Sequence, residues 1–100
     1  MITRIWHGKT KVEHADMYLN YIEETGIKDY RNIRGNLSAM ILRRIEDNIS
    51  HFWTITKWDN MESIKKFASN DYEKARYYPE DEKYLLEFEE NVTHLETFEY

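Results

Sequence analysis

The chain has 100 residues, of which 41% are hydrophobic and 15% aromatic, so residues 1–100 are expected to form one domain with its own core. It contains no cysteine, which excludes disulfides, thiolate metal sites and a cysteine nucleophile. The formal net charge of −5 argues against a protein that binds nucleic acid.

The beginning of the chain predicts a strand and then a helix. Residues 2–7 alternate as a strand does, and Gly8 is expected to end that strand. Thr10 and Glu13 have the spacing of a capping box, which starts a helix. The apolar residues behind it recur every three or four positions on one helix face: Val12, Ala15, Leu19 and Ile22. Gly26 is expected to end this helix, because glycine adopts the left-handed conformation without steric cost.

The middle of the chain predicts a β-hairpin. Residues 37–45 are largely apolar on both alternating faces, as expected for a strand that is covered on both sides. Residues 46–48 predict the turn. Residues 49–58 are rich in β-branched and aromatic side chains and predict the second strand of the hairpin.

Helices and a last strand are predicted after the hairpin. Residues 59–62 form a second capping box, and the helix behind it is expected to turn three apolar side chains inward: Ile64, Phe67 and Ala68. Residues 70–78 predict a third, short helix that the following proline stops. Residues 84–88 are expected to form a packed loop or a single turn, and residues 92–100 the last strand.

The order of these elements is that of a split βαβ unit. It predicts an α+β, ferredoxin-like sandwich with a four-stranded antiparallel sheet and helices on one face only. Because the two middle strands are apolar on both faces, one sheet face would stay exposed over several hundred square ångströms, more than soluble monomers usually show. We therefore expect a two-fold homodimer in which each copy covers the other's sheet.

A strand that ends in a tryptophan and an acid leads directly into a helix, through residues 52–59 (FWTITKWD), 61–64 (MESI) and 67–68 (FA). This string resembles the centre of the antibiotic biosynthesis monooxygenase domain, and the expected elements resemble that domain over nearly the whole chain. Residues 75–82 (ARYYPEDE) look like the signature of an uncharacterised branch. The resemblance implies a dimeric α+β barrel with a pocket between the sheet and the helices of each subunit. Members of the family use this pocket for cofactor-independent oxygenation of polycyclic quinols, or to bind and degrade haem.

The resemblance also bears on cofactors. The haem-degrading branch relies on an asparagine in the first strand, a tryptophan in the second helix and a histidine ligand just after it. This chain has His7, Phe67 and Tyr77 at these places. A phenol is a much rarer axial ligand than a histidine, so the resemblance does not extend to haem degradation and no cofactor is expected.

A cofactor-free oxygenase needs a group that takes a proton from a phenol, and an apolar cavity that holds the resulting anion beside oxygen. Histidine is the natural base near neutral pH, and tyrosine, tryptophan and arginine stabilise an oxyanion. The predicted catalytic residues are His7, Trp58 and Tyr77. The predicted substrate-binding residues are Tyr72, Arg76, Phe67 and His51.

Each candidate also has a structural interpretation. Trp58 and the tyrosines at 72, 77 and 78 are of the kind that packs in a core, with the hydroxyl groups in water. His7 could be a satisfied strand residue and His51 a solvated one. Arg76 could pair with the acids that follow it, in a surface ion pair of small energetic value.

Other classes of site are absent from the sequence. Three scattered glycines exclude a glycine-rich phosphate loop, the histidines lack metal-ligand spacing, and no serine lies in a nucleophile elbow. Residues 80–100 carry eight acids and one base, which we interpret as a solvated surface. The chain has neither an apolar signal region nor a membrane-spanning stretch, so no membrane partner is expected and the cytoplasm is the default compartment.

Three functions remain open at this point. The leading prediction is a cofactor-independent monooxygenase that acts on an aromatic or polyketide-type substrate. The alternative is a dimeric barrel that binds a small aromatic or apolar ligand and performs no chemistry. The third is a haem-binding protein with a non-standard ligand.

Overall fold

Four antiparallel strands form one sheet in the order β2-β3-β1-β4. In the computed structural model, which describes all 100 residues, the central strand β1 (Ile2–Lys11) pairs with β3 (Ile49–Trp58) and with the short β4 (Thr93–Glu96). The edge strand β2 (Asn36–Glu46) pairs with β3 as a hairpin. This topology confirms the predicted α+β, ferredoxin-like fold with a four-stranded antiparallel sheet.

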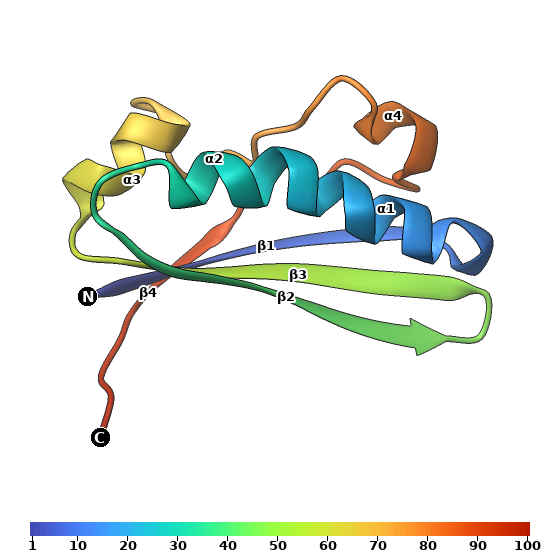
Figure 1. Cartoon of the computed structure of the whole chain (residues 1–100), viewed down its shortest axis with the longest axis horizontal. Coiled ribbons are helices and arrows are strands. Elements are labelled where there is room, and N and C mark those ends of the chain that lie inside the picture. The colour runs from blue at the N-terminus through green and yellow to red at the C-terminus, as the bar shows by residue number, and fades with distance from the viewer.

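All helices lie on one face of the sheet (Figure 1). A single turn, η1 (Val12–His14), leads into a long helical rod made of α1 (Ala15–Ile22), the π-helical segment η2 (Glu23–Ile27) and α2 (Lys28–Arg31). The helix α3 (Met61–Ala68) and the one-turn helix α4 (Asp81–Tyr84) lie beside this rod. None of the helices has the length and apolar character that a membrane crossing requires.

The core between the sheet and the helices has two parts. The larger cluster joins α1 to β1 and β3 and consists of Trp6, Ala15, Tyr18, Ile22, Phe52, Leu85 and Val92. The smaller cluster joins α2 to α3 and consists of Tyr30, Trp58, Ile64 and Phe67. Each cluster contains three aromatic side chains, and the candidate site lies where the two clusters meet.

The first strand continues past Gly8, contrary to the prediction. Thr10 is fully buried within β1 and its hydroxyl donates to the backbone carbonyl of Lys11, so it forms no capping box. A Cβ atom at Gly8 would lie 2.5 Å from the Trp6 ring and 3.0 Å from Leu85. The glycine therefore serves the close packing of Trp6 and does not end the strand.

The first helix also continues past the residue that was expected to end it. Gly26 lies in η2, and the rod runs on through Tyr30 to Arg31 before a turn at Gly35, whose φ of 102° is the left-handed conformation. A π-helical turn absorbs one extra residue without breaking the helix. The buried residues continue at helical spacing across it, so packing against the sheet outweighs the low helix propensity of glycine.

The start of α3 uses a different cap from the predicted one. The side chain of Asn60 accepts a hydrogen bond from the backbone N–H of Ser63 at 3.0 Å, while Asp59 accepts from the Ser63 hydroxyl at 2.6 Å. The pattern of residues 59–62 therefore predicted the helix correctly, but the capping residue is Asn60 and not Asp59.

Residues 70–78 form no helix, although their sequence predicted one. Their backbone pairs instead with the chain just before β4: the N–H of Ala75 donates to the carbonyl of Glu90, and the N–H of Val92 donates to that of Glu73. This pairing takes the backbone groups that a helix would need. The single helical turn lies at Asp81–Tyr84, earlier than the stretch 84–88, and β4 is shorter than the expected 92–100.

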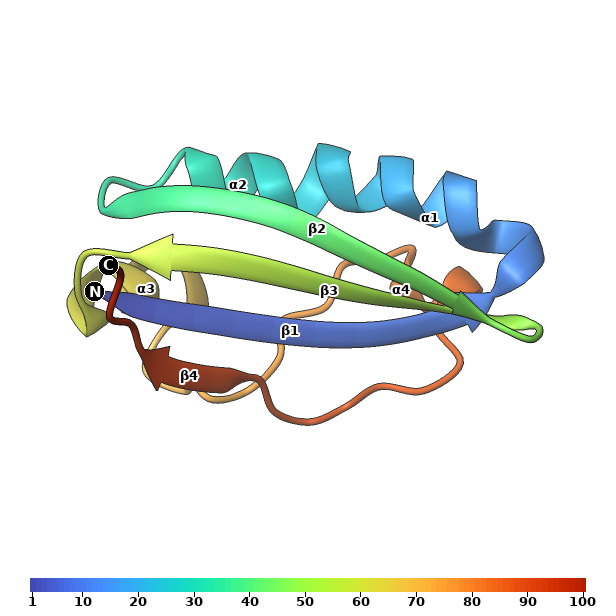
Figure 2. The same ribbon diagram turned by 90° about the horizontal axis from the view of Figure 1, so that it is seen from below.

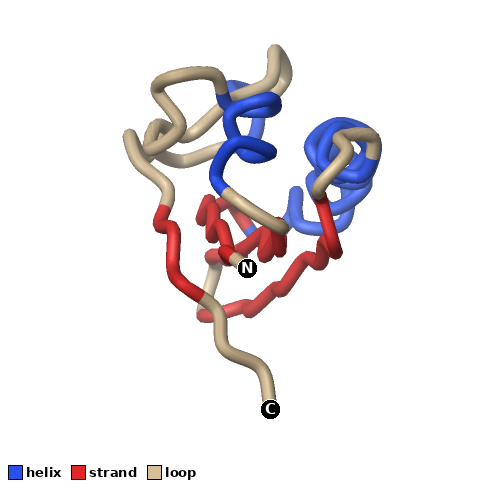
Figure 3. Tube along the Cα trace, turned by 90° about the vertical axis from the view of Figure 1, so that its left-hand side faces the viewer, coloured by secondary structure: helices blue, strands red, loops and turns tan.

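The other face of the sheet carries no helix, as Figure 2 shows. Its centre consists of cross-strand rows of apolar side chains from β2, β3 and β1: Met40, Ile55, Ile5, Leu42 and Trp53. We call this surface the open face. Met40 and Leu42 are 44% and 47% exposed, and β2, an edge strand, has no buried residue, so the expected coverage of residues 37–45 on both sides is not present in the single chain. The C-terminal residues after β4 extend away from the helices on this side (Figure 3).

Candidate functional site

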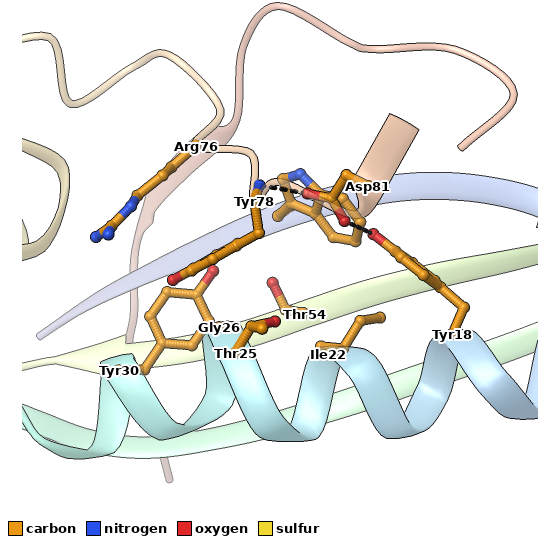
Figure 4. A pocket seen from close by; sticks show the side chains of 10 residues that line it. Tyr18, Ile22, Thr25, Gly26, Tyr30, Thr54, Arg76, Tyr78 and Asp81 are labelled. Carbon is orange, nitrogen blue, oxygen red and sulfur yellow. Dashed lines mark hydrogen bonds between the residues drawn. The ribbon is translucent and has the colours of Figure 1, made fainter. Parts of the chain in front are cut away.

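A small cavity of about 30 Å³ lies between the helical rod, the sheet and the loop that leads to α4. Tyr18 and Asp81 lie at one end of it and Tyr30 and Arg76 at the other, with Thr54 of β3 between them (Figure 4). The rod supplies the two tyrosines because positions 18, 22, 26 and 30 lie on the face of the rod that packs on the sheet. The site therefore depends on the helix continuing through Gly26.

One end of the cavity holds a buried carboxyl group. Asp81 is 3% exposed, and its two oxygen atoms accept hydrogen bonds from the Tyr18 hydroxyl at 2.8 Å and from the backbone N–H of Tyr78 at 2.6 Å. No cation lies within ion-pair distance of it. Burial raises the pKa of Asp81 and also the pKa of Tyr18, so the phenol remains a hydrogen-bond donor to the carboxylate.

Beyond the other end of the cavity, next to Tyr30, lies a buried guanidinium group. Arg4 of β1 is 2% exposed; Nη1 donates to the carbonyl of Tyr72 at 2.6 Å and to Nε2 of His94 at 3.0 Å, and Nη2 donates to the carbonyl of Lys74 at 3.4 Å. Its Nε has no partner, and no carboxylate lies within ion-pair distance. Burial raises the pKa of the Tyr30 phenol, and the neighbouring Arg4 and Thr54 oppose that rise. The Thr54 hydroxyl itself is buried without a hydrogen-bond partner.

Arg76 is the predicted site residue that lines the cavity. Its guanidinium carbon lies 4.8 Å from the ring centre of Phe67, and Nη1 donates to the Phe67 carbonyl at 3.2 Å. Nη2 lies 3.8 Å from a carboxylate oxygen of Asp29, on α2, so its acidic partner is not one of the acids that follow it in sequence. The charge of Arg76 is therefore partly compensated, and that of Arg4 is not.

The two predicted histidines lie on the open face and not in the cavity. In the antiparallel pairing of β1 with β3, His7 lies opposite Trp53 and His51 lies opposite Lys9. Both histidines are on the face of the sheet opposite the buried Trp6 and Phe52. Nδ1 of His7 lies 2.5 Å from a carboxylate oxygen of Glu89, and its Nε2 lies 2.9 Å from Nδ1 of His51. The strand alternation places them there, because residue 7 points away from the helices when residue 6 points toward them.

The remaining predicted residues lie around the cavity without lining it. Trp58 and Phe67 are buried in the smaller core cluster, and the Trp58 indole N–H donates to the Thr56 hydroxyl. Tyr77 packs against Trp6 and donates to the carbonyl of Glu89 at 2.5 Å. Tyr72 borders a second, mostly polar hollow of about 260 Å³ that is lined by residues 70–74 and Asn91. The structure therefore brings these side chains into packing roles around the cavity.

Sequence reasoning missed the residues at the two ends of the cavity. A signal was present for the tyrosines, since the spacing of Ala15, Tyr18 and Ile22 continues through Gly26 to Tyr30. Asp81 lies in an acidic run that looks like solvated surface, and Arg4 lies in a strand with mixed polarity. Nothing local distinguishes these two residues from exposed ones.

Comparisons with known proteins place the fold. No sequence-family model matches the chain, and no curated protein matches it in sequence. A solved structure of an antibiotic biosynthesis monooxygenase superposes with a TM-score of 0.71 at 17% identity, covering 99% of this chain and 100% of the other. The fold is that of the antibiotic biosynthesis monooxygenase structures. A Bacillus cereus protein proposed as such a monooxygenase gives a TM-score of 0.67 at 10% identity, with 99% and 96% of the two chains covered. These values confirm the resemblance in fold.

A further structure with this fold is a mutant of the protein MhuD with two manganese protoporphyrin IX molecules bound per active site, at a TM-score of 0.60 and 15% identity, with 97% and 94% of the two chains covered. The cavity of the present chain does not fit such a group. No histidine lines it, and its volume of about 30 Å³ holds neither a porphyrin nor a single aromatic ring unless side chains move. We therefore assign no haem chemistry to this site.

Proposed function

We propose that the chain is a cofactor-independent monooxygenase that binds a small phenolic substrate in the cavity, with Asp81 as the general base. The observation that carries the proposal is a buried carboxylate without a cationic partner, beside an aromatic-walled cavity between sheet and helices. Burial raises the pKa of the Asp81 carboxyl group above its ordinary value, which makes its carboxylate a stronger base than an exposed one. The family of the structural neighbours supports the same reaction class.

The proposed reaction needs only the substrate and molecular oxygen. Asp81 accepts the phenolic proton, Tyr18 positions the carboxylate through its hydrogen bond, and the resulting phenolate becomes electron-rich enough to react with oxygen. For a hydroquinone, one oxygen atom ends in the new ring hydroxyl and the other leaves as water. The ring loses four electrons to form a hydroxyquinone, and the oxygen molecule takes up the same four.

Substrate entry requires the side chains of Arg76 and Tyr78 to move outward, because the cavity of about 30 Å³ holds water and no aromatic ring. The backbone of residues 69–80 stays paired with Arg4, Asp81 and residues 90–92. The loop formed by these residues contains no helix and carries Arg76 and Tyr78, which close the cavity from above. Side-chain hydrogen bonds from the body of the protein hold it, among them Tyr78 Oη to Asp29 at 2.5 Å and the Glu80 N–H to Tyr21 Oη at 3.0 Å.

Oxygen consumption with a panel of hydroquinones tests the proposal. Asp81→Asn is expected to lower turnover by about 10²–10⁴-fold, because the amide is not a base. Asp16→Asn is the matched control, since Asp16 is an exposed acid on α1 that pairs with Arg43, and it should leave turnover unchanged. Full turnover in Asp81→Asn would contradict the proposal. Loss of turnover in His7→Ala would also contradict it, because the chemistry would then lie on the open face.

Ligand binding without chemistry is the second candidate function. The observation that favours it is the small volume of the cavity, about 30 Å³, which leaves no room for an aromatic substrate beside oxygen in this structure. In that case aromatic ligands raise the melting temperature of the protein and no hydroquinone is consumed. The two functions are separated by measuring both quantities on the same panel.

We also propose that the open face is the interface of a homodimer. Three apolar side chains of this face, Met40, Leu42 and Leu95, are each exposed by 44% or more. A contiguous apolar patch of this kind usually marks a protein interface. A second copy supplies a surface of the same chemistry, as a two-fold axis requires.

A further inference from the structure

The cavity lies between two buried charges of opposite sign that do not neutralise each other. Asp81 lies at the end formed by α1 and α4. Arg4 lies beyond the opposite end, near Tyr30, and does not itself line the cavity. Neither has an oppositely charged partner within ion-pair distance. Burying an unpaired charge is costly, so a complementary group on a ligand would recover much of that cost.

The partners of Arg4 satisfy its hydrogen bonds only in part and leave its charge uncompensated. Two of them are neutral backbone carbonyls, of Tyr72 and Lys74, and the third is His94. Burial and the nearby guanidinium lower the pKa of His94 to about 4, so the ring is neutral at pH 7. Nε of Arg4 and the hydroxyl of Thr54 remain without partners close to the Tyr30 phenol. This end of the site therefore offers donors and two positive charges, that of Arg4 and that of Arg76, of which only the charge of Arg76 is partly compensated, by Asp29.

We propose that the ligand is an aromatic vinylogous acid, in which a ring hydroxyl is conjugated to an oxygen-bearing acceptor group across the ring. The hydroxyl lies toward Asp81, and the acceptor oxygen lies toward Tyr30 and Thr54, with Arg4 behind them. The proposal rests on the proposed function in so far as it takes this cavity to be the ligand site.

The two charges explain why conjugation across the ring matters. When the hydroxyl proton passes to Asp81, the negative charge of the ligand moves through the ring to the acceptor oxygen at the Arg4 end. A simple phenol keeps its charge at the hydroxyl end, away from the guanidinium group. The site should therefore stabilise the anion of a vinylogous acid much more than that of an ordinary phenol.

The probe for this inference is 4-nitrophenol, whose neutral and anionic forms have different absorption spectra. Binding to the wild-type protein at fixed pH should raise the ionised fraction, as a fall of about one unit in the apparent pKa of the probe, a tenfold change in its ionisation equilibrium. Arg4→Gln should reduce this shift, because Arg76 still supplies a positive charge at the same end of the cavity, and Arg4→Lys should retain more of it. Arg43→Gln is the matched control, because Arg43 is on the same side of the sheet but pairs with Asp16 outside the cavity.

Thr54→Val keeps the shape of the side chain and removes the hydroxyl, and it should reduce the spectral shift without loss of folding. If circular dichroism shows that Arg4→Gln is unfolded, Thr54→Val is the variant that decides the test. The inference is overturned if the bound probe stays neutral in the wild type, or if the full shift survives in both Arg4→Gln and Thr54→Val.

The result can be separated from that of the proposed function. Hydroquinone turnover with an unshifted probe would overturn this inference alone. A shifted probe without turnover would support the inference and leave ligand binding as the function. If neither 4-nitrophenol nor any hydroquinone binds, both proposals are wrong.

Discussion

His94 shows how a buried cation changes a neighbouring side chain. Its Nε2 accepts a hydrogen bond from Arg4 at 3.0 Å, and its ring lies edge-on to Tyr72 with the centres 5.7 Å apart. Burial is the main reason that its pKa falls from 6.5 to about 4, and the charge of Arg4 adds to it. The neutral ring is therefore part of what keeps the guanidinium group in place.

This shift predicts a pH dependence of folding. Between pH 6.5 and pH 4, His94 is protonated in the unfolded chain and neutral in the folded chain. The free energy of unfolding therefore falls as the pH falls through this window. The loss is roughly 1–2 kcal/mol once partial exposure of the ring is allowed for. His94→Gln should remove that part of the decrease in urea-unfolding midpoints. His14→Gln is the control, and an unchanged pH profile in His94→Gln would contradict the prediction.

At the scale of elements, two glycines have opposite roles. Gly35 turns the chain from α2 into β2 with φ 102°, and a Cβ atom there would lie 2.1 Å from the Ser63 hydroxyl oxygen. Gly26 lies within the helical rod, where a Cβ atom would meet only ordinary contacts, the nearest at 3.6 Å from the Tyr30 ring. The turn requires glycine and the rod does not.

Alanine substitution should separate these roles. Gly35→Ala should lower the free energy of unfolding by roughly 2–4 kcal/mol, from the unfavourable backbone conformation and the overlap with Ser63. Gly26→Ala should be neutral or raise it by roughly 0.5–1 kcal/mol, because alanine favours a helix. Urea unfolding of both variants measures this, and equal effects would show that the turn tolerates a side chain.

The elements also show where sequence reasoning succeeds. The hairpin was predicted within one residue at each end, because its strands and turn depend on neighbouring residues: β-branched side chains and a short polar turn. The helix predicted for residues 70–78 was wrong, because the backbone of these residues pairs with residues 90–92. No local sequence pattern indicates this pairing. Most residues of the candidate site were missed for the same reason. Arg4 and Asp81 are buried by parts of the chain that are distant in sequence, and local sequence does not indicate that burial.

At the scale of the whole molecule, the helices cover one sheet face and leave the other exposed. The C-terminal tail extends on the exposed side, where Phe98 is 71% exposed and Lys57 of β3 pairs with Glu99. The tail thus adds apolar surface at the edge of the open face. This arrangement supports the proposal of a dimer formed through that face.

Sedimentation at micromolar concentration should give about twice the chain mass. Leu42→Glu places a charge within the open face and should give the single-chain mass, because burying an unpaired charge costs several kcal/mol. Met17→Glu is the matched control, since Met17 is 56% exposed on α1, and it should remain dimeric. A wild-type protein that sediments as one chain at all accessible concentrations would rule out the dimer.

The central strand β1 contributes to both surfaces of the sheet. Arg4 and Trp6 point toward the helices, while Ile5 and His7 point to the open face. Loss or gain of one residue within β1 would exchange the two sets and bury a histidine where the indole belongs. Only insertions or deletions of two residues would keep each side chain of this strand on its own face of the sheet.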